Sequence, residues 1–400
     1  MFTRPDYTPA RANAGFHYGV GSSQGALRAL AGIPIREFNL EVSACAEAYR
    51  LGRIRQRELF GDQVGQYPVI TPAVSYGHVN CLGSELLFPE GGEVAHTHIY
   101  GSLQEGIAAL QRPVDWTAQG MFPFYLEFSD RLQELFPEEK VRCCFGGEGP
   151  VTTAYELRGD GFFTDIYDDP PLAQEFMRLT VDSILDFDRC TAALNGQPFP
   201  NTTGGGMCDD IASFISPALF PQFVLPYWEQ LYQGTTTGTR SAHVEDLRPE
   251  QVPFLEEIGL SQFDPSISPR LTPRILSERC RVPFTWRLES FHMREMDEQD
   301  IVDFVFQSAV DGASGVSLTL GELSANEACL PQVQAFLRAG QEAKGLLEGG
   351  CSRAELRQRV SAVGQSKLWD GWCGYLGPAS TRGGRGVAGR TDWGMRAAAR

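Results

Sequence analysis

A histidine and a glutamate stand two residues apart in the segment SAHVED, residues 241–246. In an extended backbone the side chains of residues i and i+2 point to the same side, so His243 and Glu245 would face one point. Imidazole nitrogen and carboxylate oxygen are both zinc ligands, and a catalytic zinc takes three protein ligands and keeps one position open. We therefore interpret His243 and Glu245 as candidate metal ligands, and Glu245 also as a candidate catalytic carboxylate.

A third ligand is available in the loop GELSANEACLP, residues 321–331, which contains Cys329. A metal in such a site would lower the pKa of a bound thiol or water and so supply a nucleophile at neutral pH. The alternative is structural: Asp246 would cap the following helix, Glu245 would face solvent and Cys329 would be one more buried thiol. Spacing alone favours this structural alternative.

A pair of aspartates follows a glycine run in NTTGGGMCDD, residues 201–210. Glycine lets a backbone approach a ligand closely, and we expect a strand to end here. Asp210 is thus a candidate catalytic residue and Asp209 a candidate substrate-binding residue, with the alternative that Asp210 only caps the next helix. Further candidate substrate-binding residues lie at or beyond the ends of later strand-like segments: Asp264, Arg287 and His292.

Helical and β-rich patterns alternate along the C-terminal half, which favours a parallel sheet covered by helices. The predicted helices cover residues 217–234, 248–260, 297–312 and 331–347, and the predicted strands cover 240–246, 282–288 and 315–321. Connections of this length suit an α/β fold of the (β/α)8 TIM-barrel type, with an N-terminal helical extension, better than two independent domains. In that fold the carboxyl ends of the strands build the active site, which is where the candidate residues lie. We expect one domain over residues 1–376 and a mobile Gly-, Arg- and Ala-rich tail over 377–400.

Charge and composition narrow the class of protein. The 400 residues carry a net charge of −16, from 34 basic and 50 acidic residues, which argues against a nucleic-acid-binding surface. No apolar stretch is long enough to cross a bilayer and the N-terminus lacks the apolar core of a signal peptide, so we expect a cytoplasmic protein without membrane contact. The 10 cysteines form no CxxC pair, which indicates neither a disulfide framework nor a zinc finger.

Four stretches together resemble the uroporphyrinogen decarboxylase superfamily, whose fold is a TIM barrel. They are YGHVNCLGSELLFPEGG (76–92), GGEGPVTTAYELRGDGFFTDIYDDPPLAQEFM (146–177), GMCDDIASFISPALFPQFVLPYWEQLY (206–232) and the SAHVED strand with its helix. The resemblance covers roughly residues 40–345. Its most specific part is ASFISPALFPQFVLPY with the Asp-Asp pair just before it, because this pair, a Ser-Pro and a Leu-Pro-Tyr stand in the family's order.

The superfamily divides by chemistry, so membership alone leaves the function open. Its decarboxylases resemble one another in an Arg-rich N-terminal motif of the type RQAGR, which this chain lacks; the arginines of RLGRIRQREL, residues 50–59, lie in a predicted helix. Decarboxylation of a carboxylated tetrapyrrole is therefore the second hypothesis. A barrel that binds a corrinoid or tetrapyrrole without catalysis is the third.

The first hypothesis is a methyltransferase of the corrinoid-dependent branch, in which a zinc is held by His-x-Cys and a distant Cys. The resemblance carries these ligand positions to His243, Glu245 and Cys329, with Glu in place of the middle Cys. Carboxylate donates less charge than thiolate and leaves zinc more Lewis acidic, which suits an oxygen-bound or nitrogen-bound methyl group. The resemblance then implies methyl transfer between a small-molecule methyl donor or acceptor and the cobalt of a corrinoid (cobalamin-type) cofactor on a partner protein, because no cobalamin-binding domain is visible in the sequence.

Overall fold

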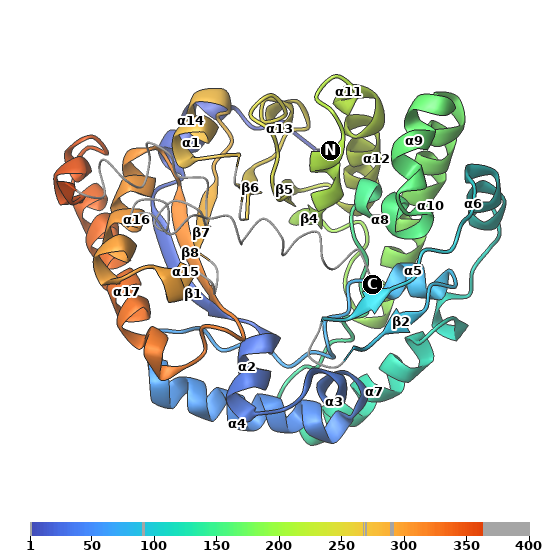
Figure 1. The fold of residues 1–400 in the computed structure, drawn as a ribbon, viewed down its shortest axis with the longest axis horizontal. Coiled ribbons are helices and arrows are strands. Elements are labelled where there is room, and N and C mark those ends of the chain that lie inside the picture. Colours follow the sequence, from blue (N-terminus) through green and yellow to red (C-terminus); the bar gives the residue numbers. More distant parts are fainter. Residues whose placement is uncertain (1, 90–92, 267, 269, 289–291, 363–400) are drawn as a thin grey trace, which may run out of the picture.

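Two three-stranded parallel sheets form the centre of the fold, with strand orders β1-β8-β7 and β4-β5-β6 (Figure 1). The computed structural model describes residues 2–89, 93–266, 268, 270–288 and 292–362. The strands are β1 His17–Ser22, β4 Gly204–Cys208, β5 Thr239–His243, β6 Gln262–Asp264, β7 Thr285–Leu288 and β8 Gly315–Leu320, and a short antiparallel hairpin adds β2 Leu86–Leu87 and β3 Ala95–His96.

The neighbours across these sheets follow the order of the chain. A parallel bridge between Phe263 and Phe284 joins β6 to β7, so that the two sheets continue each other. At the β4 edge of the second sheet, the backbone N–H of Gly149 donates to Cys208 O at 2.6 Å, which places the segment before residue 150 beside β4. That segment is bridged in turn to residues 70 and 74. Within the described residues, regular strand pairing does not close the sheets into a complete barrel.

Helices lie outside the strands, as Figure 1 shows. The helices are α1 Tyr7–Asn13, α2 Gln24–Ala31, α3 Ile35–Leu40, α4 Val42–Phe60, α5 Gly77–Cys81, α6 Leu103–Leu110, α7 Phe122–Leu135, α8 Pro150–Arg158, α9 Gly161–Asp168, α10 Pro170–Leu194, α11 Phe220–Phe223, α12 Leu225–Thr235, α13 Phe254–Glu257, α14 Pro273–Arg279, α15 His292–Glu295, α16 Glu298–Val310 and α17 Leu330–Glu348. Four 3-10 helices complete the set: η1 Trp116–Ala118, η2 Asp210–Phe214, η3 Glu327–Cys329 and η4 Glu355–Arg359.

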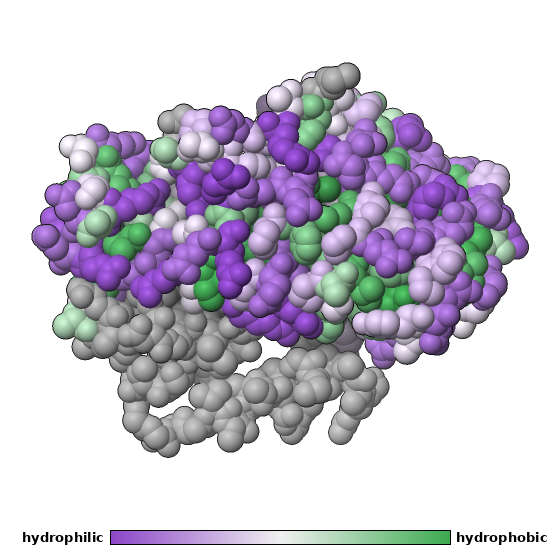
Figure 2. Space-filling model, turned by 90° about the horizontal axis from the view of Figure 1, so that it is seen from above, coloured by the Kyte–Doolittle hydropathy of each residue, from purple (hydrophilic) through white to green (hydrophobic). Residues whose placement is uncertain are grey.

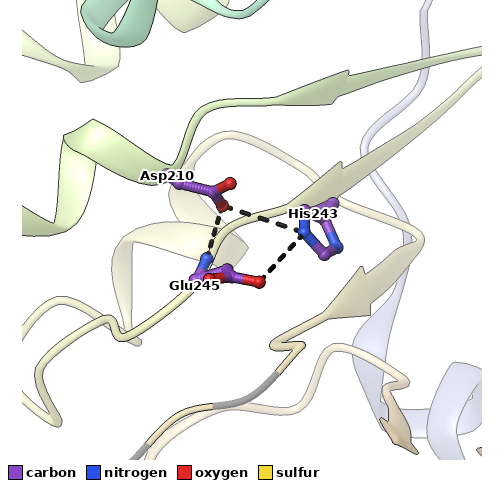
Figure 3. Close-up of side chains that lie close together, drawn as sticks. All are labelled: Asp210, His243 and Glu245. Carbon is purple, nitrogen blue, oxygen red and sulfur yellow. Dashed lines mark hydrogen bonds and ion pairs between the residues drawn. The ribbon is translucent and has the colours of Figure 1, made fainter. Parts of the chain in front are cut away.

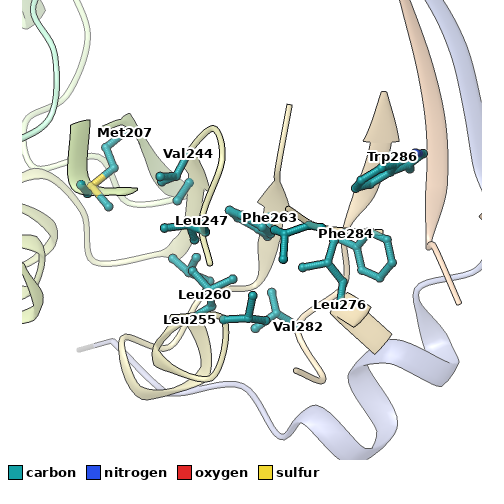
Figure 4. Close-up of a cluster of buried hydrophobic side chains, with 14 of the residues drawn as sticks. Met207, Val244, Leu247, Leu255, Leu260, Phe263, Leu276, Val282, Phe284 and Trp286 are labelled. Atoms are coloured by element: carbon teal, nitrogen blue, oxygen red, sulfur yellow. The ribbon is translucent and has the colours of Figure 1, made fainter. Parts of the chain in front are cut away.

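Each strand buries one face against this helical layer. Along β5, Arg240 and Ala242 are buried while Ser241 and His243 stay partly open, and the same alternation runs through β6, β7 and β8. Figure 4 shows the apolar side chains behind the strands, including Phe263, Phe284 and Trp286, which pack together with residues of α13 and α14. Burial of such side chains on one face is what fixes the register of the strands.

The opposite face of the strands carries small and polar side chains. They include Gly19 of β1, Gly206 of β4, Ser241 of β5, Gln262 of β6, Thr285 of β7 and Ser317 of β8. Bulky branched residues normally fill the interior of a barrel of parallel strands. Here the small residues leave room on that face, and this room becomes important for the site.

Most of the predicted elements of the C-terminal half are present, with shifted ends. The predicted helix over 217–234 is divided into α11 and α12, because Pro226 lacks an N–H group and cannot continue a helix from the preceding turn. The predicted strand over 240–246 ends at His243. The predicted N-terminal helical extension is present only in part. One helix, α1, precedes β1, whereas α2, α3 and α4 follow this strand.

Among the described residues, no helix is both long and apolar enough to span a bilayer. The face shown in Figure 2 is mainly hydrophilic with scattered hydrophobic residues. The predicted domain boundary at residue 376 and the predicted mobile tail lie outside the described residues.

Candidate metal centre and cavity

Asp210, His243 and Glu245 form a cluster at the carboxyl ends of β4 and β5 (Figure 3). One ligand atom from each residue lies within 4.8 Å of the others. The Nε2 atom of His243 is 3.8 Å from Oδ1 of Asp210 and 3.8 Å from Oε1 of Glu245. Within the described part of the chain, this is the one group of three or more such ligands at this spacing.

The register of the strands explains why these residues meet. Cys208, at the end of β4, pairs with His243, at the end of β5, so Asp210 and Glu245 each lie two residues beyond a paired position. The side chains of His243 and Glu245 therefore lie close together, as their spacing of two residues predicts, although β5 ends at His243. Asp210 joins them because it begins η2 immediately after β4.

Two loops hold Glu245 in place. Its backbone N–H donates to Asp210 Oδ1 at 2.7 Å, and Ser266 donates its hydroxyl to Glu245 Oε1 at 2.6 Å. Asp246 and Ser266 have positive φ angles of 57° and 47°, in the left-handed region that non-glycine residues seldom adopt. Such backbone outliers persist only where surrounding contacts impose them, and here both lie beside the cluster.

His243 is oriented from its other side by Asp264. The distance between His243 Nδ1 and Asp264 Oδ2 is 3.1 Å, and Asp264 is itself bonded by the Ser266 backbone N–H at 2.8 Å and paired with Arg287 at 3.3 Å. If Nδ1–H donates to this carboxylate, Nε2 presents its lone pair to the cluster. A carboxylate behind a histidine is the arrangement that fixes metal-binding imidazoles.

The charges around His243 favour a cation between the three side chains. Burial lowers the pKa of His243, but the hydrogen bond and charge of Asp264, followed by the charge of Asp210, outweigh burial and raise it overall. Burial raises the pKa of Asp210, against the opposing effects of the Glu245 N–H and of His243. The cluster thus attracts positive charge, whether as a proton on His243 or as a metal ion.

The donor set fits a metal ion. Two carboxylates and one imidazole are ligands that zinc accepts at about 2.0–2.2 Å, and a tetrahedral ion at that distance separates its ligands by about 3.3–3.6 Å. The observed 3.8 Å separations are close to this value. Small side-chain movements would bring the three atoms onto one ion.

A cavity of about 570 Å³ opens beside the cluster, within the range of small-molecule sites. Its wall is formed by residues of β4, β5 and β6, by Ser75 and the segment before α8, and by α10 and α12: Ser75, Gly147, Glu148, Gly149, Ile184, Asp188, Gly206, Met207, Cys208, Leu231, Thr235, Ser241, Ala242, His243, Gln262 and Asp264. No lysine or arginine is among these described lining residues. The cavity therefore combines apolar surface with acidic groups.

Two of the acidic groups have strongly altered acidity. Burial raises the pKa of Glu148 to about 7, opposed by a hydrogen bond from Ser75 and reinforced by the charges of Asp210 and Asp209. Burial alone raises the pKa of Asp188 to about 6. Cys208, also in the wall, has a pKa raised to about 12 by burial and by neighbouring carboxylates, so its thiol is protonated at neutral pH.

The other predicted site residues lie in different surroundings. Cys329 is buried at the end of η3 and is not part of the three-residue cluster. His292 is buried in α15, where burial lowers its pKa to about 3 and keeps it neutral. Arg287 contacts Asp264 and donates to the Ser266 hydroxyl at 3.1 Å. Arg287 thus contacts the two residues, Asp264 and Ser266, that orient His243 and Glu245.

Asp209 serves the fold at this place. It is fully buried and accepts hydrogen bonds from Trp228 Nε1 at 2.6 Å and from the backbone N–H groups of Thr152 and Val151 at 2.7 and 3.3 Å. The last two are unsatisfied donors at the N-terminus of α8, so Asp209 caps that helix from a distant strand. Its role in substrate binding stays a prediction.

Sequence reasoning missed Glu148, Asp188 and Cys208 as site residues. Glu148 stands between glycines in GGEGP, a signal of close backbone approach, and Cys208 directly precedes the Asp pair. Asp188 gives no local signal, because it lies within the long helix α10.

Comparison with known proteins adds one finding at this point. No family model matches the chain, and no curated protein does. A solved structure, the methyltransferase from Methanosarcina mazei, matches with a TM-score of 0.60 over 86% of this chain and 99% of that chain, at 16% sequence identity. The chain therefore shares the fold of that protein.

Proposed function

We propose that this chain is a metal-dependent methyltransferase with a uroporphyrinogen decarboxylase-like (β/α)8 barrel. It would move a methyl group between a small molecule and the cobalt of a corrinoid on a partner protein. The observation that carries the proposal is the cluster of Asp210, His243 and Glu245 at the carboxyl ends of neighbouring strands, beside a cavity. The shared fold with a methyltransferase supports it.

The barrel interpretation rests on the order of neighbours. All strand pairs of the two sheets are parallel, and β4, β5, β6, β7 and β8 are adjacent in the order of the chain, with β8 next to β1. The bridges at residues 70–74 and 142–145 supply the two remaining positions between β1 and β4. This is the order of a barrel of eight parallel segments, whose active sites lie at the carboxyl ends of the strands.

Asp210, His243 and Glu245 would hold the metal, with Asp210 taking the place that the sequence pattern gives to Cys329. A bound zinc acts as a Lewis acid on the atom that the methyl group leaves or joins. Asp264 orients His243, and Ser266 orients Glu245, so that both point at one position. The cavity wall positions the small molecule and excludes water from it.

The partner protein would dock at the same edge of the sheets. Phe214, at the end of η2, is 65% exposed, and Leu323, in the loop after β8, is 50% exposed. Both follow the carboxyl ends of strands and border the side on which the cluster opens. Exposed apolar side chains around a site are typical of a protein-binding rim.

The decarboxylase hypothesis predicts a basic pocket for a substrate with many carboxylates. The described wall instead contains Glu148, Asp188 and Asp264 and no lysine or arginine. Such a wall repels a polyanion. The arginines at 50, 53, 55 and 57 lie in α4, as predicted, where they contact backbone carbonyls or acidic side chains of the protein itself.

Metal content tests the proposal directly. The full chain, loaded with zinc and freed of excess metal, is expected to retain one zinc per molecule, and His243→Ala is expected to lose it. His96→Ala serves as the matched control, because His96 lies outside the cluster.

Demethylation of free methylcobalamin, followed by its visible absorbance, tests the methyl transfer. Wild-type protein without retained zinc would contradict the metal site, and unchanged methylcobalamin with every thiol, amine and alcohol acceptor tried would contradict the transfer.

A further inference from the structure

Two carboxyl groups in the cavity have no cationic partner among the described residues. Glu148 and Asp188 both line the cavity, and neither forms an ion pair with a described lysine, arginine or histidine. By contrast, Asp264 in the same wall is paired with His243 and Arg287. Glu148 is close enough to His243 and Asp210 for their charges to affect its pKa, whereas no charged group is among the causes of the altered pKa of Asp188.

Asp188 is the more unusual of the two. It comes from α10, a helix of 25 residues, and α10 and α12 also supply Ile184, Leu231 and Thr235 to the cavity wall. No described group donates a hydrogen bond to its carboxylate, and burial is the sole cause of its altered acidity. Asp188 is half-buried, and holding a carboxylate partly out of water without a partner destabilises a folded protein. A partner from outside the chain would remove this cost.

The lining indicates what this partner is. An anion would be repelled by Glu148 and Asp188, and a neutral ligand would leave both carboxylates unpaired. A hydrated metal ion would gain little from the apolar wall formed by Ile184, Met207 and Leu231. An organic cation satisfies both features, because its charge can face the carboxylates while its alkyl groups contact the apolar wall.

We propose that the cavity binds a small protonated alkylamine, whose N–H donates to Asp188 while Glu148 supplies the second negative charge. The inference rests on the proposed function in one respect, namely that an N-methyl group of this amine is the group transferred. The N–C bond then breaks with its electron pair left on nitrogen, so the ammonium leaves as a neutral amine. The methyl group goes to the electron-rich cobalt(I) of the partner's corrinoid.

Three probes of nearly the same shape test the charge and the N–H separately, by calorimetry with the full chain. Protonated N,N-dimethylethanolamine has both, choline has the charge without the N–H, and 3-methylbutan-1-ol has neither. We expect dimethylethanolamine to bind best, choline several-fold more weakly and the alcohol at least tenfold more weakly than the amine. Equal binding of amine and alcohol, or no binding of the amine, would overturn the proposal.

Variants locate the bound amine. Asp188→Asn is expected to weaken amine binding at least tenfold and to leave the zinc content unchanged. Asp182→Asn removes the same charge from an exposed position of α10 and is the matched control, with unchanged binding expected. Glu148→Gln is a second test, with several-fold weaker binding expected. Amine binding that neither variant changes would place the amine elsewhere and refute the inference.

The two proposals fail in different ways. Amine binding that depends on Asp188, in a protein that retains no zinc, would support the cavity assignment and contradict the metal site. Retained zinc and demethylation of methylcobalamin, without amine binding, would leave the methyltransferase in place and overturn the substrate class. Loss of amine binding after titration with magnesium or calcium would mark the carboxylates as a metal site and overturn the amine proposal.

Discussion

The backbone N–H of Glu245 donates a 2.7 Å hydrogen bond to Oδ1 of Asp210. This bond joins the loop after β5 to the first residue of η2, so the main chain itself fixes one candidate ligand relative to the other. Ligands held in this way need little rearrangement when an ion binds, which is the condition for a well-defined metal site. The surrounding contacts lead to four predictions.

Ser266→Ala is expected to weaken zinc binding about tenfold with little change in fold. The substitution removes the hydroxyl that orients Glu245 Oε1 and that also contacts Arg287. Loss of a contact behind a ligand typically costs about 10- to 100-fold in metal affinity. Competition with a chromogenic chelator measures the change, and Ser352→Ala, at an exposed serine, is the control. Unchanged affinity would mean that Glu245 is not a ligand.

Asp264→Asn is expected to weaken zinc binding about 10- to 100-fold. The amide is a poorer acceptor for the Nδ1–H group of His243, so the imidazole loses the orientation that points Nε2 at the cluster. The same competition assay measures this. Asp62→Asn, at an exposed surface pair with Arg57, should leave the affinity unchanged. A fully retained affinity in Asp264→Asn would contradict the supporting role of Asp264.

Asp188→Asn is expected to stabilise the free protein in a pH-dependent way. Burial raises the pKa of Asp188 to about 6 from an ordinary 3.8, so the folded state favours the protonated form and loses stability as the pH rises from 3.8 through 6. The amide cannot ionise, and its advantage in the free energy of unfolding should be small at pH 4 and reach about 3 kcal/mol above pH 7.

Urea unfolding of both proteins across this pH range measures the difference. The titration of Glu148, His243, Cys208 and Asp264, which line the same cavity, is common to both proteins and largely cancels in the comparison. An advantage that is the same at pH 4 and pH 8 would show that the pKa of Asp188 is not raised by folding. A destabilised variant at pH 8 would show that the carboxylate has a partner within the chain.

Phe214→Ala is expected to lower methyl transfer with a corrinoid-carrying partner severalfold and to leave transfer with free methylcobalamin nearly unchanged. The exposed phenylalanine would contact the partner and not the small substrate. Leu194→Ala is the control, because Leu194 is 46% exposed at the end of α10, on the side where β4 begins. Equal loss of activity in both assays would place Phe214 at the substrate instead.

Local spacing predicted the site only where the chain is extended. His243 and Glu245 share a side because they are two residues apart at a strand end, and the structure brings them together. Asp210 was recognised as a catalytic candidate, but its place beside His243 depends on the pairing of Cys208 with His243, which spacing within one segment does not show. The third ligand from Cys329 was inferred from a distant loop, and the cluster contains Asp210 in that position.

The helical pattern carried even less information about the cavity. The apolar spacing of a long helix such as α10 shows which face is turned inward, but not whether that face meets a packed core or a hollow. Asp188 therefore looks like an ordinary polar residue of a helix, and its place in the wall of a cavity is visible only in the three-dimensional structure. For the same reason the barrel-like fold was easier to predict than its interior.

The small residues on the inner strand face have a consequence for how specificity can change. A side chain at Gly206 would meet the Ser241 hydroxyl, since a Cβ atom built there lies 2.9 Å from Ser241 Oγ. Enlarging either position would reduce the volume of the cavity without replacing any of the three candidate ligands. Substitutions on β4 and β5 alone would thus be expected to change the length of the molecule that the cavity accepts, without any change in the candidate metal ligands.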